Sequence, residues 1–152
     1  MKHLNWNCKK FSELGTTELY SILRLRSEVF IVEQKCVYQD LDDSDQPALH
    51  VMAFLDDELV AYARALPPGI KYESSSIGRV VTSSKIRRDG YGKVLVEKVI
   101  ASCRENWPQH DITISAQHYL ESFYKSFGFI TESEPYLEDD IPHVLMRLPN
   151  TD

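Results

Sequence analysis

No stretch of the sequence approaches the run of about 20 apolar residues that a membrane-spanning helix needs, and residues 4–11 are too short and polar for a signal peptide. Asn-X-Ser/Thr glycosylation sites are absent as well. Cysteine is scarce, with three widely spaced residues, Cys8, Cys36 and Cys103. These absences favour a cytoplasmic protein with reduced thiols over a secreted disulfide scaffold.

Positive charge is also limited, because 17 basic residues face 23 acidic ones and the formal net charge is −6. Affinity for a phosphate backbone comes from clustered Lys and Arg, so this balance argues against a nucleic-acid partner. A local basic site could still bind a small anionic ligand. The five histidines are scattered along the chain, so we expect no metal site.

The composition is that of an ordinary globular protein, with 43% hydrophobic and 26% charged residues. The chain contains no repeat, linker or low-complexity tract, and its length suits one domain over residues 1–152. Apolar periodicity predicts strands at 3–8, 50–55, 58–66, 76–82, 112–116, 129–132 and 143–148, and helices at 17–33, 90–106 and 117–127. Antiparallel strands followed by β-helix-β units indicate an α/β fold with a mixed sheet.

The segment from Ile77 to Lys93 carries the clearest chemical signal. A buried strand ends at Thr82, and a loop then enters a helix through Gly90 and Gly92. The first N–H groups of a helix lack partners and attract phosphates, and glycine lets the backbone approach the anion closely. The segment therefore suggests a pyrophosphate cradle, although two glycines would also suit a helix that simply begins beside a turn.

Two common nucleotide motifs do not fit this segment. In a Walker A reading, Arg87 would stand at the first glycine and Val94 at the Ser/Thr position. In a Rossmann reading, Leu95 would occupy the third glycine. Both interpretations are excluded.

Tyr124 is the second candidate, on an apolar helix face with Leu120 and Phe127. One interpretation is a core tyrosine whose hydroxyl finds one partner. The other is a general acid, because a phenol of pKa about 10 can give a proton to a thiolate leaving group of pKa about 8.5.

Arg87-x-x-Gly90-x-Gly92, followed by Phe123-Tyr124-Lys-Ser-Phe-Gly-Phe129, resembles the GNAT acetyltransferase family. More closely, the chain is similar to the ElaA-like branch of that family. That likeness lies in residues 25–34, in residues 136–146, and in Tyr38, Asp42, Asp45 and His50. It implies a GNAT-like mixed, mostly antiparallel sheet that is splayed at its centre, with helices on both faces and acetyl-CoA in the gap.

The resemblance also implies roles for individual residues. The backbone of Val80, Val81 and Thr82 would pair with the pantetheine amides, Gln117 would contact the cofactor where many relatives have Asn, and Tyr124 would protonate the departing CoA thiolate. The pyrophosphate would lie on the backbone of Arg87, Arg88, Asp89, Gly90, Tyr91, Gly92 and Lys93. The sequence departs from the family pattern at Asp89 inside this loop, at Asp140 where relatives often have Gly, and at Val37 in place of Pro.

The expected reaction is direct attack of a primary amine on acetyl-CoA in a ternary complex, because no covalent nucleophile is evident. An alkylamine of pKa about 10.4 is about one part in two thousand neutral at pH 7, a handicap near 4.6 kcal/mol. A general base would relieve it. Glu33, His50, His143 and a water are the candidates.

The sequence does not identify the amine that accepts the acetyl group. The acidic loop 40–45 would either attract a cationic amine or be an ordinary solvated loop, and Arg26, Arg64 and Arg79 would either pair with its acids or stay exposed. A non-catalytic acyl-CoA-binding or interaction module is the alternative to an enzyme. An exposed strand edge makes a homodimer plausible by analogy with the fold.

Overall fold

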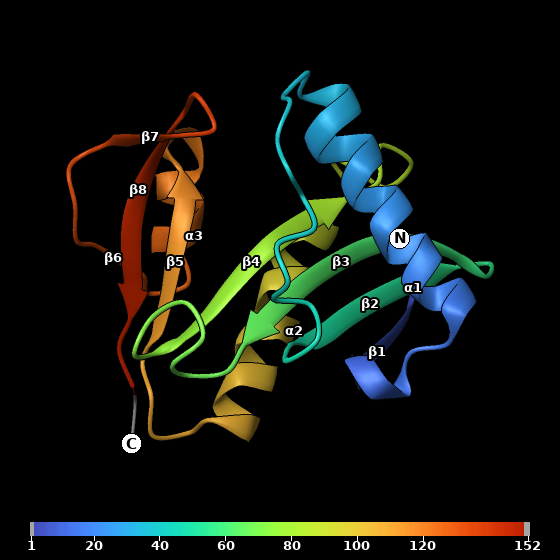
Figure 1. The fold of residues 1–152 in the computed structure, drawn as a ribbon, viewed down its shortest axis with the longest axis horizontal. Helices are drawn as coiled ribbons and strands as arrows, with labels where there is room; N and C mark the ends of the chain where they lie inside the picture. Colours follow the sequence, from blue (N-terminus) through green and yellow to red (C-terminus); the bar gives the residue numbers. More distant parts are fainter. Residues whose placement is uncertain (1, 151–152) are drawn as a thin grey trace.

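The computed structural model describes residues 2–150. Within this range, eight strands form one sheet in the order β1-β2-β3-β4-β5-β8-β6, with β7 also paired to β8 (Figure 1). Only the β4–β5 pair is parallel among these described strands. The strands are β1 (Asn5–Lys10), β2 (Leu49–Leu55), β3 (Glu58–Leu66), β4 (Ser75–Thr82), β5 (Ile112–Gln117), β6 (Ile130–Thr131), β7 (Tyr136–Glu138) and β8 (Ile141–Leu148). The mixed, mostly antiparallel sheet that the sequence predicted is confirmed.

Helices cover both faces of the sheet (Figure 1). Helix α1 packs on one face, where Ile22 and Leu25 meet Met52, Tyr62 and Val81. Helices α2 and α3 pack on the other face, in a larger core. The helical segments are α1 (Thr16–Arg26), α2 (Tyr91–Asn106) and α3 (Glu121–Lys125), with 3-10 turns at Phe11–Glu13 and His118–Leu120 and a π-helix at Ser27–Glu33.

The π-helix continues α1 without a break, so the single helix predicted for residues 17–33 is present but changes its winding at Ser27. Its hydrogen bonds span five residues, from the Gln34 amide to the Val29 carbonyl and from the Cys36 amide to the Ile31 carbonyl. The wider turn brings Val29, Phe30 and Glu33 to the wall of a cleft.

Residues that favour positive φ stand at three turns of the chain. Asp56 and Asp57, which connect β2 to β3, both have positive φ, as a tight hairpin requires. Gly128 ends the segment after α3 with φ 103°. Asp140 takes φ 62° in the β7–β8 hairpin, so the aspartate accommodates the turn there.

The C-terminal half differs from the prediction in two details. The helix expected over 117–127 begins later, because Gln117 is the last residue of β5 and a 3-10 turn precedes α3. Strand β7 was not predicted, since three residues carry too little alternation.

No helix in the described residues is long and apolar enough to cross a membrane.

Candidate active site

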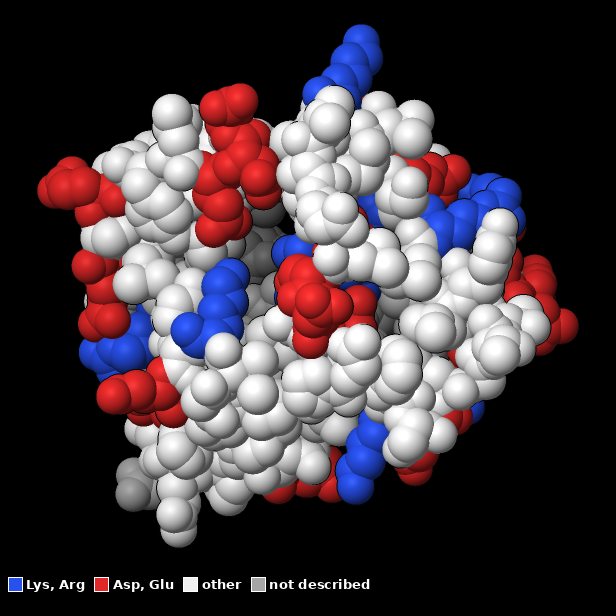
Figure 2. Space-filling model, in the orientation of Figure 1, with Lys and Arg blue, Asp and Glu red and all other residues white. Residues whose placement is uncertain are grey.

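A cleft opens where β4 and β5 separate. The two strands pair only at Ser75–Ile112 and Ser76–Thr113, whereas β4 stays paired with β3 up to Thr82. A register shift in the β3–β4 pairing and the positive φ of Arg79 mark a bulge in β4 just beyond this point. The resulting cleft holds about 520 Å³ and is visible as a hollow in Figure 2. A volume of this size suits a small-molecule ligand.

The cleft brings together several of the predicted site residues. Val80, Val81 and Thr82 line it from β4, and Gln117 lines it from the end of β5. Beyond Ser76, β4 has no pairing to β5, so the backbone groups on that side of Val80–Thr82 have no strand partner, although the Thr82 carbonyl accepts from Arg87. Arg87 and Tyr124 line the same cleft.

The N-terminus of α2 has the features of an anion site. Gly90 caps the helix in the left-handed region, with φ 86°, and no side chain caps the first turn. A Cβ built on Gly92 would meet no atom within 4 Å, so the space above this backbone is open. Arg88, Asp89 and Lys93 are exposed there. The unpaired first N–H groups and the positive end of the helix dipole would favour a phosphate.

Tyr91 differs from its neighbours in this segment. Its ring is buried in the main core, and its hydroxyl donates to the backbone carbonyl of Lys2. Only the backbone of Tyr91 could therefore serve a ligand.

Arg87 spans the rim of the cleft. Its Nε and Nη2 donate to the Thr82 carbonyl at 3.1 and 3.0 Å, and Nη2 lies 2.7 Å from Glu33 Oε1. The first of the candidate general bases is therefore ion-paired with an arginine of the proposed phosphate loop.

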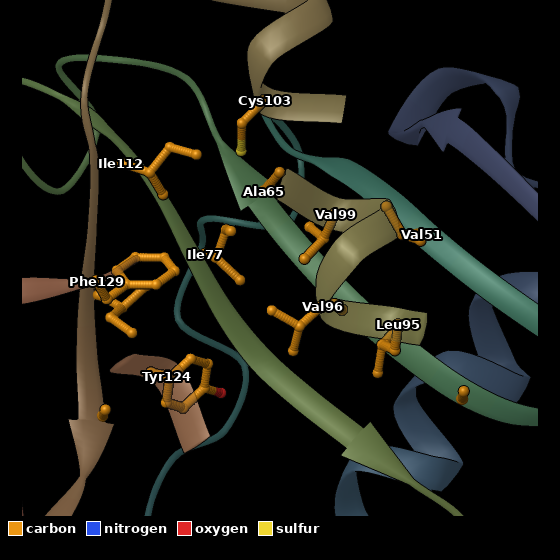
Figure 3. Packing of buried hydrophobic residues seen from close by; sticks show 14 of the residues in the cluster. Val51, Ala65, Ile77, Leu95, Val96, Val99, Cys103, Ile112, Tyr124 and Phe129 are labelled. Atoms are coloured by element: carbon orange, nitrogen blue, oxygen red, sulfur yellow. The ribbon is translucent and has the colours of Figure 1, made fainter. Parts of the chain in front are cut away.

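Tyr124 lies on α3 at the floor of the cleft, buried against Phe123 and Phe129 in edge-on ring contacts. Figure 3 shows its hydroxyl directed toward β4. No described residue forms a hydrogen bond with this hydroxyl. Burial, with a smaller effect of Tyr119, raises the pKa of Tyr124 to about 12. The phenol therefore stays protonated at neutral pH and is free to contact a ligand.

His50, the second candidate base, does not reach the cleft. It is fully buried on β2, with Nδ1 2.6 Å from the Tyr62 hydroxyl and Nε2 2.9 Å from the Asp45 carbonyl. Burial lowers the pKa of His50. The structure therefore corrects this candidate to a structural histidine.

His143, the third candidate, lines the cleft from β8. Its Nδ1 is 2.6 Å from the Ile141 carbonyl and its Nε2 is 3.4 Å from Glu138 Oε2. The Ser115 hydroxyl donates to Glu138 Oε1 at 3.1 Å. Sequence reasoning did not single out Glu138 or Ser115, because their meeting depends on the short β7 strand.

Three of the four carboxylates of the acidic loop are paired with arginines, whereas the fourth, Asp43, is exposed. Arg26 is fully buried and pairs with Asp40 at 2.9 Å and Asp45 at 2.7 Å. Arg64 pairs with Asp42 and Asp45, and Arg79 pairs with Asp40 and Asp42. Three arginines thus neutralise three carboxylates and fasten the loop to the sheet.

A comparison with known protein families decides the relationship. Residues 11–149 match the model described as an acetyltransferase (GNAT) domain. The chain belongs to the GNAT acetyltransferase family. It is 42% identical to protein ElaA of Escherichia coli strain K12 over 145 residues, which are 94% of this chain and 95% of that protein.

Solved structures of GNAT relatives have the same fold. An acyl-CoA N-acyltransferase from Pseudomonas aeruginosa is 43% identical, with a TM-score of 0.93 over 97% of this chain and all of that one. The crystal structure of E. coli ElaA is 40% identical, with a TM-score of 0.92 and coverages of 97% and 100%. The predicted ElaA-like relationship and the GNAT fold are therefore confirmed.

Proposed function

We propose that this GNAT protein transfers the acetyl group of acetyl-CoA to a primary amine by direct attack in a ternary complex. One observation carries the proposal: a single cleft is lined by Arg87, which precedes the uncapped N-terminus of α2, and by a buried phenol whose hydroxyl has no hydrogen-bond partner among the described residues. The first feature suits the phosphates of CoA, and the second suits its sulfur. The relative from P. aeruginosa, which is described as an acyl-CoA N-acyltransferase, supports this assignment.

The residues around the cleft fit acetyl-CoA. The backbone of Val80, Val81 and Thr82 would bind the pantetheine arm along the free side of β4, with Gln117 opposite. The pyrophosphate would lie on the backbone of residues 87–93, where Gly92 leaves room for close approach. Asp89 is exposed and so need not face the anion. The acetyl thioester would then lie between β4 and β5 near Tyr124.

Tyr124 would act as the general acid. Attack of the amine nitrogen on the thioester carbonyl forms the C–N bond and breaks the C–S bond, and the phenol gives its proton to the departing sulfur. The described residues contain no group of three or more His, Cys, Asp or Glu side chains that could hold a metal, and no metal is part of the proposal.

The acidic loop gives little indication of the acceptor class, because Arg26, Arg64 and Arg79 pair with three of its four carboxylates. Acidic side chains do flank the hollow in Figure 2, and Glu138 and Asp139 of the β7–β8 hairpin line the cleft. A cationic amine is therefore still the expected acceptor. A reduced, cytoplasmic setting and a homodimer also stay predictions.

An acceptor screen tests the proposal. Acetyl-CoA is incubated with the protein and with polyamines, amino acids, aminoglycosides or peptides, and free thiol is measured. We expect amine-dependent thiol release together with thermal stabilisation by CoA, which at 100 times Kd is worth about 2.7 kcal/mol. Stabilisation without thiol release for any amine would favour the non-catalytic acyl-CoA-binding module, and the absence of both would remove the cofactor assignment.

A further inference from the structure

The side chains around the cleft are divided between the two faces of the sheet. Side chains alternate along a strand, and directly paired residues of neighbouring strands share a face. Ile112, Ile114 and Ala116 of β5 point into the core that contains Tyr124. Ser115 and Gln117 therefore point to the opposite face, as does His143, which pairs with Gln117. Tyr124 and His143 approach the cleft from opposite sides of the splayed sheet.

The hydrogen bond of His143 fixes its tautomer. A backbone carbonyl can only accept, so Nδ1, 2.6 Å from the Ile141 oxygen, must carry a proton. In the neutral ring, Nε2 then holds a lone pair. This nitrogen is 3.4 Å from Glu138 Oε2, beyond the usual length of a hydrogen bond. In the neutral ring, the Nε2 lone pair and the Glu138 carboxylate repel each other. Protonation of Nε2 would replace this repulsion by an ion pair between the imidazolium and Glu138.

The neighbours of His143 hold this arrangement in place. Tyr136 stacks on the imidazole with an interplanar angle of 25°. The Ser115 hydroxyl binds both the Tyr136 hydroxyl and Glu138. Lys71 and Asp139 are further charged groups on the cleft wall. His143 is itself buried, with 6% of its surface exposed, so its ring has little freedom to turn.

The other two candidate bases are engaged elsewhere. His50 is buried with both ring nitrogens in hydrogen bonds. Glu33 forms an ion pair with Arg87. Among the three candidates, His143 is the one that lines the cleft and is not paired with an arginine.

We propose that His143 is the general base of the transfer, with Glu138 as a positioning residue that stabilises the imidazolium; the assignment rests on the proposed function. Nε2 takes a proton from the incoming ammonium, and the neutral amine then forms the C–N bond. When the amide forms, the nitrogen loses a second proton. This proton balances the one that Tyr124 gives to sulfur. The net products are the amide, CoA thiol and one proton released to solvent. The base works on one face of the sheet and the acid on the other.

The tautomer can be tested without turnover. Long-range ¹H–¹⁵N correlation spectra of the ¹⁵N-labelled protein report which imidazole nitrogen carries the proton, and His143→Asn assigns the signals. We expect the neutral ring of His143 to be protonated at Nδ1. Protonation of the neutral ring at Nε2 would overturn the proposal, because that nitrogen would then hold no lone pair.

Kinetics test the role itself with two kinds of probe. Butylamine, spermidine and lysine methyl ester carry alkylammonium groups at pH 7, whereas hydroxylamine is largely neutral and needs no base to free its nitrogen. In His143→Asn, the side-chain amide can still donate to the Ile141 carbonyl. We expect kcat with an alkylamine to fall at least about 100-fold, and kcat with hydroxylamine to change less than about threefold.

Matched variants separate this role from a structural one. Glu138→Gln keeps an acceptor for Ser115 but loses the charge, so we expect up to about a fivefold loss with alkylamines and none with hydroxylamine. His110→Asn, in the exposed turn after α2, should change neither rate. Equal losses for both probe types in His143→Asn, or no loss, would refute the base assignment. A wild-type protein that releases no thiol with any probe would instead refute the proposed function, and this assignment with it.

Discussion

Replacing Tyr124 by Phe removes one oxygen atom from the floor of the cleft. The ring is 7% exposed and packs edge-on against Phe123 and Phe129, contacts that phenylalanine retains. The hydroxyl has no hydrogen-bond partner in the described part of the chain, so its removal leaves no polar group unsatisfied. We therefore expect the free energy of unfolding to change by less than about 1 kcal/mol.

The effect on catalysis follows from the raised pKa of the phenol. With a pKa of about 12, Tyr124 stays protonated across the neutral range and can donate until the pH approaches that value. Complete transfer to a free thiolate of pKa about 8.5 would be uphill by about 4.8 kcal/mol, so donation must accompany cleavage of the C–S bond. General acids in this role contribute about 100-fold to 10,000-fold. We expect kcat of Tyr124→Phe to fall by at least about 100-fold.

The assay compares thiol release with CoA binding. Calorimetry should give a Kd for CoA within about twofold of the wild-type value, because the phenol acts on the reacting sulfur and not on the phosphates. Tyr20→Phe, an exposed position on α1, serves as the control for a lost phenol. Unchanged kcat in Tyr124→Phe would refute the acid role, and an equal loss in both variants would point to a general effect on the preparation.

Three other variants or conditions test the cradle and the charge network. Gly92→Val should raise the Kd for CoA at least about tenfold, measured by calorimetry, while the melting temperature does not fall, because a Cβ there meets no atom within 4 Å outside its chain neighbours and its own helix backbone; unaltered affinity would refute the cradle. Arg26→Leu removes one of the two arginine partners of buried Asp40 and of buried Asp45 and should lower the urea-derived free energy of unfolding by about 2–3 kcal/mol, whereas Arg24→Leu on the same helix should cost about 0.5 kcal/mol or less; equal effects would deny the network a special role. Burial opposes ionisation of Asp42 and Asp45, but their arginine partners outweigh it and lower the pKa of both carboxyls. The resulting stability is fully present above about pH 4 and should be lost as the pH falls toward the lowered pKa values of the folded state. Urea midpoints that stay constant between pH 5 and pH 2 would contradict this.

Local signals in the sequence predicted much of the fold. Asp56, Asp57 and Gly128 form turns because they tolerate positive φ, a property that depends only on the residue and its immediate neighbours. The strand that ends at Thr82 and the helix that follows Gly90 were placed within one residue for the same reason. The cleft, by contrast, depends on how far β4 and β5 stay paired, which no local pattern encodes.

Long-range contacts explain what sequence reasoning could not supply. Arg26 lies on a helix face that reads as an ordinary charged position, yet it is fully buried because Asp40 and Asp45 fold over it. His143 could be named as a candidate, but its tautomer depends on the Ile141 carbonyl and its charge partner on the β7–β8 hairpin. Such roles follow from which surfaces meet, and only a three-dimensional structure gives that.

The change of winding at Ser27 has an evolutionary consequence. The first part of this helical segment, α1, serves stability, since Ile22 and Leu25 are buried. The wider turn of the π-helix changes the direction of the side chains that follow α1, so Phe30 and Glu33 line the cleft while α1 stays packed on the sheet. Insertion or loss of a single codon in this stretch would rotate those two side chains by about a quarter of a turn. A change confined to this stretch would therefore alter the wall of the cleft without rebuilding the scaffold.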